Sequence, residues 1–273
     1  MASLSAPDPA PQRVALVVGA SRGIGATTAR AFAARGVAVV LAARDAAALD
    51  AVAAGIEAGG GRALALPTDV TDAAAAATLV ERTVAAFGRL DYAFNNATDG
   101  TMPAPLAEVP VDGFDRALAA NTRGTFLGMR HQIPAMLETA GGGAIVNMAS
   151  VAGAQAVANL GPYATAKAGI IMLSKVAALD YADRGIRVNV VAPGPILTHH
   201  LERAGAEAQR QAAASTPMGR VGQPEEVASA VLWLCSDGAA FITGATLPID
   251  GGQSAGIKPP RMYRPGEPMA AAG

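Results

Sequence analysis

Short apolar runs alternate with longer segments of helical character from about residue 13 to residue 250, and this alternation restricts the fold most. The strands it predicts are Val14–Val18, Val37–Leu41, Ala63–Leu66, Tyr92–Asn95, Ala144–Met148, Val188–Val191 and Thr246–Ile249. Most of these runs are almost continuously apolar, which is typical of strands buried on both faces. The helical segments include Asp45–Ala58, Ala73–Phe87, Phe114–Leu137 and Tyr163–Asp183. The pattern predicts an α/β fold, with a doubly wound parallel sheet of about seven strands and helices on both faces.

The 273 residues show one compositional regime, with no internal repeat and no linker, so residues 13–252 are predicted to form a single domain. Residues 1–12 contain three prolines, no Lys or Arg, and no apolar segment. They are predicted to be a disordered leader and not a signal peptide. The proline-rich residues 253–273 are predicted to be an irregular tail, with a crossing onto a neighbouring subunit as the alternative.

Charge and cysteine content limit the classes of partner. Lys and Arg number 21 against 22 Asp and Glu, for a net charge of −1. That balance provides no basic excess for nucleic acid. The single cysteine, Cys235, suits a reducing compartment, so we expect a cytoplasmic protein. The longest uncharged stretch, Thr139–Ala166, is interrupted by glycines and amides, which argues against a membrane span.

A glycine-rich turn follows the first predicted strand directly and leads into an alanine-rich helical run. Glycines allow the backbone to turn sharply beside a pyrophosphate, and a helix N-terminus offers free N–H groups. A turn without a ligand is the alternative, but the strand–turn–helix context favours a dinucleotide. The residues predicted to bind it here are Gly19, Ser21, Arg22, Gly23, Ile24 and Gly25.

The residues after the second strand bear on which dinucleotide binds. An acidic residue there favours the ribose hydroxyl of NAD(H), whereas a basic one favours the 2′-phosphate of NADP(H). This chain has neutral Ala43 followed by Arg44, and Arg22 lies in the turn itself. Asp45 is simply explained as the N-cap of the next helix. We therefore expect NADP(H) to be preferred, with NAD(H) possible.

Tyr163 and Lys167 lie four residues apart at the start of a predicted helix, on one face of it. A nearby ammonium stabilises a phenolate and lowers the pKa of the phenol, which allows Tyr163 to act as a general acid or base. Ser150 follows the strand Ala144–Met148, at the edge where α/β sheets bind ligands. It is a candidate for holding the substrate oxygen, or else a turn serine.

The glycine turn, Ser150 and the run Tyr163-Ala164-Thr165-Ala166-Lys167 together closely resemble the short-chain dehydrogenase/reductases. The resemblance extends from about Val14 to Gly252 and implies a Rossmann-type fold. It implies that Asn121 completes a catalytic tetrad with Ser150, Tyr163 and Lys167, its backbone holding a water that links Lys167 to solvent. Tyr163 and Lys167 are implied to contact the cofactor as well.

Further cofactor contacts are implied by shorter motifs. Asp69-Val70 is similar to the family's adenine contact, and Asn96-Ala97 belongs to the Asn95-Asn96-Ala97 motif beside the cofactor. The loop that binds the nicotinamide and phosphates is implied to include Pro193, Gly194, Ile196 and Thr198. Two residues depart from the pattern: Val18 stands where Thr is frequent, and Thr98 replaces a common Gly. Thr98 implies an altered loop or cofactor affinity.

The three histidines, His131, His199 and His200, lack the Cys or carboxylate cluster of a metal site, so no metal is expected. His199 and His200 open the stretch of residues 199–220 that the family uses as a substrate lid. A substrate contact there and a solvated helix are both open. The predicted role of Cys235 is that of a small buried hydrophobe.

The function expected is hydride transfer between NADP(H) and a secondary alcohol or ketone. A reductase of 3-oxoacyl groups or polyketides on a carrier protein is the first alternative, and a catalytically silent sensor or scaffold is the second. Few bases flank the predicted helices, which disfavours docking of an acidic carrier. Apolar residues near the site, Val151, Ala152, Val157 and Leu160, suggest a substrate with an apolar body. The resemblance implies a homotetramer, or a homodimer, paired through Phe114–Leu137 and Tyr163–Asp183.

Overall fold

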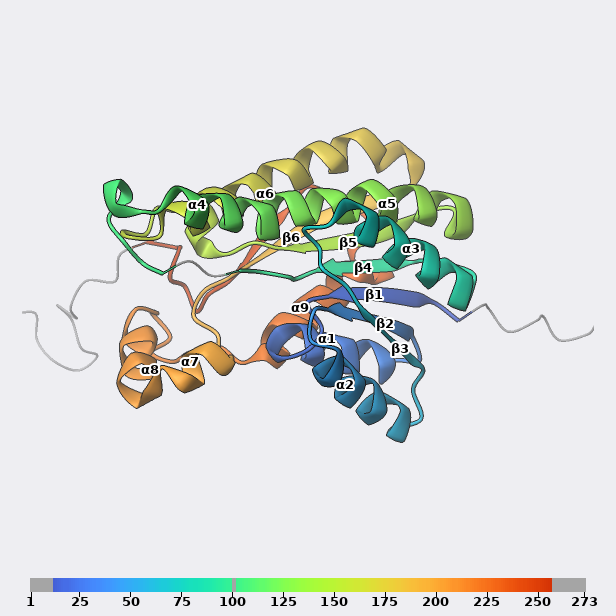
Figure 1. Cartoon of the computed structure of the whole chain (residues 1–273), viewed down its shortest axis with the longest axis horizontal. Coiled ribbons are helices and arrows are strands. Elements are labelled where there is room, and N and C mark those ends of the chain that lie inside the picture. Colours follow the sequence, from blue (N-terminus) through green and yellow to red (C-terminus); the bar gives the residue numbers. More distant parts are fainter. Residues whose placement is uncertain (1–11, 100–101, 257–273) are drawn as a thin grey trace, which may run out of the picture.

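Residues 12–99 and 102–256 are described in the computed structural model, and they build one sheet with helices on both faces (Figure 1). The predicted leader falls on residues 1–11 and most of the predicted tail on residues 257–273, outside the described residues.

The sheet has seven strands, all paired in parallel, in the order β3-β2-β1-β4-β5-β6-β7. The strands are β1 (Val14–Val18), β2 (Ala38–Ala43), β3 (Ala63–Pro67), β4 (Tyr92–Asn95), β5 (Gly143–Met148), β6 (Ile186–Pro193) and β7 (Thr246–Ile249). This confirms the predicted Rossmann-type α/β fold. The order reverses between β1 and β4, and such a switch point opens a crevice at the carboxyl ends of the strands.

Two layers of helices sandwich the sheet (Figure 1). The long helices are α1 (Gly23–Ala33), α2 (Ala46–Ala58), α3 (Ala73–Phe87), α4 (Val111–Leu118), α5 (Gly124–Ala140), α6 (Gly161–Tyr181), α8 (Gly205–Ala214) and α9 (Pro224–Cys235). One core cluster joins α1, α2 and α9 to one face of the sheet. Another joins α3, α5 and α6 to the opposite face. The short helix α7 (His199–Arg203) and α8 follow β6 and border the carboxyl edge.

Local signals in the sequence fix several helix ends. The Asp45 carboxylate accepts a hydrogen bond of 3.1 Å from the Ala48 amide, which confirms its predicted role as the N-cap of α2. Asp72 caps α3 in the same way. Gly88 and Gly141 end α3 and α5 in the left-handed conformation that glycine adopts without strain.

The predicted segment Phe114–Leu137 is helical throughout, but it contains an irregular turn that the prediction did not include. α4 ends at Leu118, a π-helical turn η2 (Ala119–Arg123) follows, and α5 begins at Gly124. The Asn121 side chain bonds the Ala117 carbonyl across 2.9 Å, which satisfies a backbone group beside the irregular turn. The apolar periodicity does not reveal the π-helical turn, because α4, η2 and α5 follow one another with no non-helical residue between them.

Cys235 is buried at 3% exposure, as predicted. Burial raises the pKa of its thiol to about 12, which suits a packing role and not a reactive one. In the part of the chain that the structure describes, no helix is both long enough and apolar enough to span a bilayer.

Candidate active site

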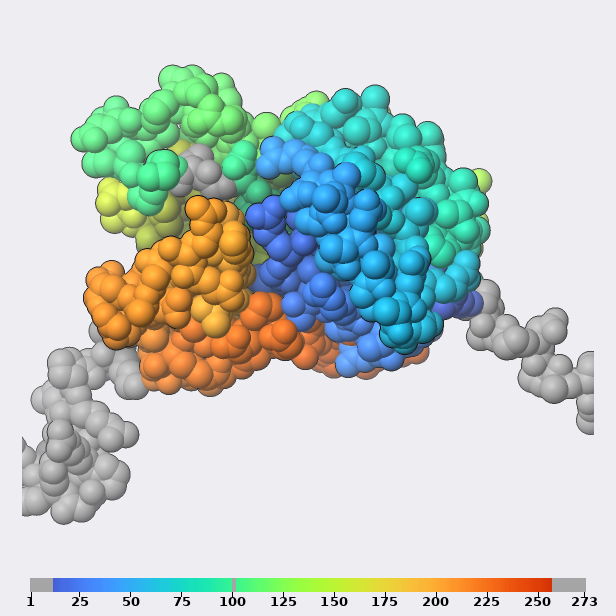
Figure 2. All heavy atoms as spheres, turned by 60° about the horizontal axis from the view of Figure 1, so that its bottom comes forward, coloured from blue at the N-terminus to red at the C-terminus, as the bar shows by residue number. Residues whose placement is uncertain are grey.

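The predicted site residues converge on the carboxyl edge of the sheet, although they are spread over 180 positions of the sequence. Most of them lie at or just beyond the ends of β1 to β6, whereas Asn121 lies on the turn η2 and Tyr163 and Lys167 lie on α6. Figure 2 shows this face hollowed between the blue segments near the start of the described chain, the green segment that carries α4 and the orange helices α7 and α8. Parallel pairing brings all of these strand ends to one side, and so gathers the candidate residues.

The glycine turn is packed too tightly for any larger side chain. A Cβ atom at Gly25 would lie 2.0 Å from the Gly19 carbonyl oxygen, and one at Gly19 would lie 2.8 Å from the Ala97 amide. Gly19 also has a φ of +77°, which favours glycine. Helix α1 begins after Arg22 with no side-chain cap and no acidic residue in its first turn. The uncapped backbone N–H groups at the start of α1, together with the helix dipole, fit the phosphates of a dinucleotide.

Neighbouring strand ends support the turn. The Asn96 side-chain amide donates a 3.0 Å hydrogen bond to the Gly19 carbonyl, so the end of β4 holds the glycine turn. Thr198, beyond β6, lies opposite it, since its Cγ2 is 3.6 Å from where a Cβ of Gly23 would be. Asn96, Ala97 and Thr198 therefore lie beside the glycine turn. Ile196 is buried at 8% exposure and forms a bridge with Gly222.

The end of the site beyond β2 and β3 carries exposed charges. Arg22 forms an ion pair with Asp45, with Nη2 and Oδ2 3.2 Å apart, and Arg44 is exposed beside them. Sequence reasoning assigned Asp45 the capping role alone and missed this second one. Two hydrogen bonds from Thr71, backbone and side chain, lower the pKa of Asp69, and the positive charge of Arg44 lowers it further. Val70 packs close to Gly124 at the start of α5.

Tyr163 and Lys167 lie on the first turns of α6, facing the end of β5. The Lys167 Nζ is 5.5 Å from the centre of the Tyr163 ring and donates a 3.0 Å hydrogen bond to the Met148 carbonyl. Ser150 lies two residues beyond Met148, and its hydroxyl accepts a 3.2 Å hydrogen bond from the Ala152 amide. The Pro193 carbonyl at the end of β6 is 3.4 Å from the same hydroxyl. Three neighbouring elements thus bring these side chains together.

Burial shifts the pKa values of both Tyr163 and Lys167. Desolvation raises the pKa of Tyr163, and a hydrogen bond with Ser150 acts against that rise. Lys167 is 1% exposed, and desolvation lowers its pKa to about 7. Desolvation is thus the largest influence on the phenol pKa and shifts it upward, opposite to the lowering expected from a lysine charge, an effect that residue spacing does not reveal.

Asn121 is fully buried in the π-helical turn η2, and the hydrogen bonds of its side chain stay within the protein. Its Oδ1 accepts a 2.8 Å hydrogen bond from the Thr98 hydroxyl, and its Nδ2 donates to the carbonyls of Ala117 and Asp99. Thr122 in the same turn donates to the Ala166 carbonyl of α6 across 2.8 Å. Sequence reasoning identified Thr98 only as a departure and missed Thr122, since neither partner is near in sequence.

A chain of buried polar side chains links β4 and β5 to α5 and α6. The Asn95 side chain on β4 bonds Gln132 on α5 and Asn147 on β5, and Asn147 donates across 2.8 Å to the Ser174 hydroxyl on α6. All four side chains are at most 5% exposed. A satisfied buried network of this kind fixes α5 and α6 relative to the sheet.

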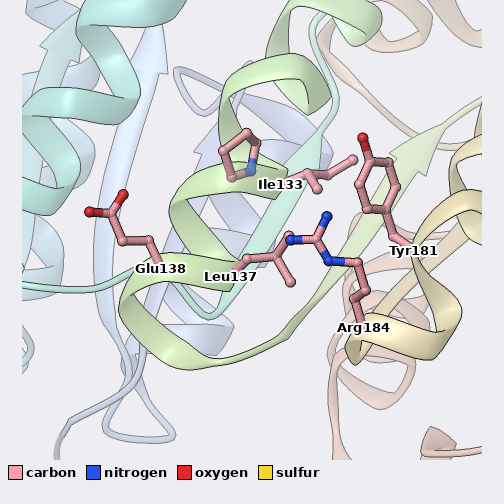
Figure 3. Close-up of a pocket in the computed structure, with 6 residues that line it drawn as sticks. Ile133, Leu137, Glu138, Tyr181 and Arg184 are labelled. Atoms are coloured by element: carbon pink, nitrogen blue, oxygen red, sulfur yellow. The ribbon is translucent and has the colours of Figure 1, made fainter.

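A separate hollow of about 360 Å³ lies between α5 and α6 at their far ends. Figure 3 shows Ile133 and Leu137 of α5 facing Tyr181 and Arg184, while Glu138 points to the other side of its helix. Tyr181 is about 27 Å along α6 from Tyr163, at 1.5 Å per residue, so this hollow is not part of the candidate site. Across residues 12–99 and 102–256, no three His, Cys, Asp or Glu side chains are grouped as metal ligands.

Comparison with known proteins gives the family. A family model described as Enoyl-(Acyl carrier protein) reductase matches residues 19–254. Cis-4-hydroxycyclohexanecarboxylate dehydrogenase of Sinomonas cyclohexanicum is 44% identical over 244 residues, covering 89% of this chain and 97% of the relative. Cyclohexanol dehydrogenase of Acinetobacter sp. (strain SE19) is 41% identical over 240 residues, covering 88% and 94%.

Solved structures agree with these relatives. The crystal structure of levodione reductase superposes with a TM-score of 0.86 at 34% identity, covering 90% of this chain and 99% of that one. A 7α-hydroxysteroid dehydrogenase, solved in complex with NADH and 7-oxo glycochenodeoxycholic acid, has a TM-score of 0.83 at 34% identity, covering 89% and 94%. The chain therefore belongs to the short-chain dehydrogenase/reductase family, and it is an NAD(P)-dependent oxidoreductase that acts on CH–OH groups.

Proposed function

We propose that this enzyme transfers a hydride between NADP(H) and a secondary alcohol or ketone on an aliphatic ring, with Tyr163 as the general acid and base. The observation that carries the proposal is the convergence of Tyr163, Lys167 and Ser150 at the carboxyl ends of β5 and β6. The names of the relatives, which act on hydroxylated cyclohexane and cyclohexadiene rings, support the ring as substrate.

Each side chain has a defined task in this proposal. Ser150 holds the substrate oxygen by its hydroxyl. The hydroxyl hydrogen can point to the hollow at the carboxyl edge of the sheet when it is not donated to the Pro193 carbonyl. Tyr163 supplies a proton to that oxygen in reduction and removes it in oxidation. Because burial keeps its phenol protonated, the resting residue is ready as an acid. Lys167 orients Tyr163 and returns protons to it, and the backbone of Asn121 links Lys167 to solvent through water.

The bound cofactor supplies or accepts the hydride. We assign its phosphates to the turn Gly19–Gly25 with Ser21, Arg22, Gly23 and Ile24, and to Thr198. Its adenine is assigned to Asp69 and Val70, and its nicotinamide side to Asn96, Ala97, Tyr163, Lys167, Pro193, Gly194 and Ile196. The fit rests on the glycine turn, where a Cβ at Gly19 or Gly25 would clash with the surrounding backbone, so the turn keeps the tight form that leaves its N–H groups free for phosphate.

Preference for NADP(H) is supported by charge beyond β2. Ala43 offers no carboxylate for a ribose hydroxyl, and exposed Arg44 lies next to Arg22. Two guanidinium groups suit a 2′-phosphate. The ion pair of Arg22 with Asp45 weakens the preference for NADP(H), because the carboxylate neutralises one of the two guanidinium charges and repels phosphate. NAD(H) is thus the expected second cofactor.

An apolar substrate body is supported by apolar side chains that are accessible near the site, among them exposed Val157 and half-buried Leu160. Val151 and Ala152 are each 6% exposed and belong to the core, so they do not form pocket walls. Leu106 is 75% exposed and lies against Gly161, two residues before Tyr163. Met218 is 69% exposed beside Gly251. These two side chains border the site from opposite loops and suit a carbocycle.

A homotetramer, or a homodimer, remains our proposal for the assembly. Its support is an exposed apolar strip on α6, formed by Met172, Val176 and Leu179 at helical spacing, together with Phe126 on α5. A cytoplasmic location is proposed on composition, because a chain with one buried cysteine has no need of an oxidising compartment.

The test is turnover of a panel of secondary alcohols and ketones with NADPH and NADH, including cyclohexanol, cyclohexanone and a carrier-bound 3-oxoacyl group. Ring substrates are expected to give saturable turnover, and Tyr163→Phe is expected to reduce kcat by about 10²- to 10⁴-fold, the usual contribution of an acid–base residue. Tyr181→Phe, at the far end of α6, is the matched control. Turnover of the carrier-bound group alone would favour the first alternative, and NADPH binding without any turnover would favour a sensor.

A further inference from the structure

The Thr98 hydroxyl donates a 2.8 Å hydrogen bond to the side chain of Asn121, and it does so from the position where the family commonly has glycine. We infer that Thr98 is a positioning residue that holds the π-helical turn η2 in its active geometry through Asn121. The inference rests on the proposed function, since it concerns the residue that is proposed to link Lys167 to solvent.

The hydrogen bonds of the Asn121 amide show why the contact matters. Asn121 is 0% exposed. Its Nδ2 donates to the Ala117 carbonyl at 2.9 Å and to the Asp99 carbonyl at 3.2 Å, so both amide hydrogens have acceptors. The Oδ1 receives its hydrogen bond from Thr98. Loss of that donor would leave a buried acceptor unsatisfied, which costs more than an ordinary hydrogen bond contributes.

The geometry of the turn connects this amide to the reacting side chains. The Gly124 amide bonds both the Ala119 and the Asn121 carbonyls, so the Asn121 backbone belongs to the irregular part of the turn. On the other side, the Thr122 hydroxyl holds the Ala166 carbonyl, one residue before Lys167. The turn is therefore fastened to the loop after β4 by Thr98 and to α6 by Thr122.

Close packing makes the second attachment specific. A Cβ at Gly169 would lie 2.9 Å from the Thr122 Cγ2, so α6 approaches the turn at a residue without a side chain. A turn that shifts at Asn121 must also shift Thr122 and the α6 backbone at Ala166. Release of the Thr98 bond is thus transmitted to Lys167 and Tyr163 through contacts that are all present in the structure.

The experiment compares Thr98→Val, which keeps the shape but replaces the hydroxyl with a methyl group, with Thr98→Ser, which keeps the hydroxyl. Thr83→Val is the matched control, because Thr83 is fully buried on α3 and donates its hydroxyl to the Leu79 carbonyl at 2.8 Å, outside the candidate site. The measurements are kcat and KM for NADPH and for a ring ketone, with the thermal midpoint of each variant.

Thr98→Val is expected to lower kcat by about three- to tenfold with KM for NADPH changed by less than about twofold, because one hydrogen bond that positions Asn121 is lost and none is lost from the cofactor turn. Thr98→Ser is expected to restore kcat. Thr83→Val is expected to lower the thermal midpoint without lowering kcat. Should Thr98→Val fail to fold, a kcat of Thr98→Ser below one-tenth of wild type would equally oppose the inference.

Two results overturn it, and they are distinguishable from failure of the proposed function. Wild-type kcat in Thr98→Val, in an enzyme that Tyr163→Phe inactivates, removes the role of Thr98 alone. A rise in KM for NADPH together with a fall in kcat, which Thr98→Ser does not reverse, assigns Thr98 to cofactor contact instead. Undiminished turnover in Tyr163→Phe removes the proposed function, and this inference with it.

Discussion

The Lys167 ammonium donates a 3.0 Å hydrogen bond to the Met148 carbonyl, and this contact joins the first turns of α6 to the end of β5. The side chain is 1% exposed and passes beneath the Tyr163 ring. A charge in such a place is costly unless it is paired, because the protein interior solvates it poorly. The desolvation that lowers its pKa to about 7 therefore also has consequences for stability.

Lys167→Met is expected to change how the stability of the protein depends on pH. Between about pH 7 and the ordinary lysine value of 10.5, the unfolded chain binds more protons at this position than the folded chain. The free energy of unfolding of the wild type therefore rises with pH through that window, and Lys167 contributes up to about 1.4 kcal/mol per pH unit to the rise. Below pH 7 both states are protonated and the full penalty remains.

Denaturant unfolding of both proteins at several values from pH 7 to 9.5 measures the difference in slope. Lys175→Met, at an exposed position on the same helix, is the matched control. If wild type and Lys167→Met had parallel pH dependences, the buried lysine would not be titrating as its desolvation implies.

Charge at the end of β2 is expected to set the cofactor preference. Asp45→Asn retains an N-cap for α2 but releases Arg22 from its ion pair. We expect the preference for NADPH over NADH to rise by about two- to fivefold, which corresponds to the usual free energy of an exposed ion pair. Arg44→Ala is expected to act in the opposite direction by about tenfold or more, because it removes a charge-assisted contact to phosphate.

The ratio of kcat/KM for NADPH to that for NADH, measured at low and at physiological ionic strength, decides this. Added salt is expected to reduce both effects, since the charges are exposed. A large NADH preference that Arg44→Ala leaves unchanged would contradict the assignment of Arg44 to a 2′-phosphate.

Gly25→Ala is expected to abolish tight cofactor binding, because the new methyl group would lie 2.0 Å from the Gly19 carbonyl oxygen and force the turn apart. The overpacking is expected to destabilise the protein by about 1–3 kcal/mol. Gly55→Ala, on α2 with nothing within 4 Å of its Cβ position, is expected instead to stabilise by about 0.5–1 kcal/mol.

Titration of NADPH fluorescence and thermal unfolding of the two variants measure both effects. Wild-type affinity in Gly25→Ala would mean that phosphate does not occupy this turn. A loss of affinity in Gly55→Ala would show that the assay reports general disturbance of the domain and not the turn itself.

The predicted fold followed from local patterns, and so did the glycine turn and the pairing of Tyr163 with Lys167, whereas Asn121 and the loop of residues 193–198 were implied by the family resemblance. The buried apolar runs gave Val14–Val18 and Tyr92–Asn95 with correct bounds, because parallel strands covered by helices need apolar residues on both faces. Asp45 was recognisable as a cap from its position alone. The spacing of Tyr163 and Lys167 placed them on one helical face without any knowledge of tertiary contacts.

The amino-acid sequence by itself therefore determined the order of elements, the glycine turn and which reactive side chains share a strand end or a helix face, since these depend on neighbours in the chain. Only the tertiary structure decided that Asp45 pairs with Arg22, that Thr98 holds Asn121, and that desolvation raises the pKa of Tyr163 and lowers that of Lys167. Those outcomes depend on groups 23 residues or more apart, or on how many atoms surround a side chain. Local periodicity carries no information about either quantity, because both arise when separate elements pack against one another.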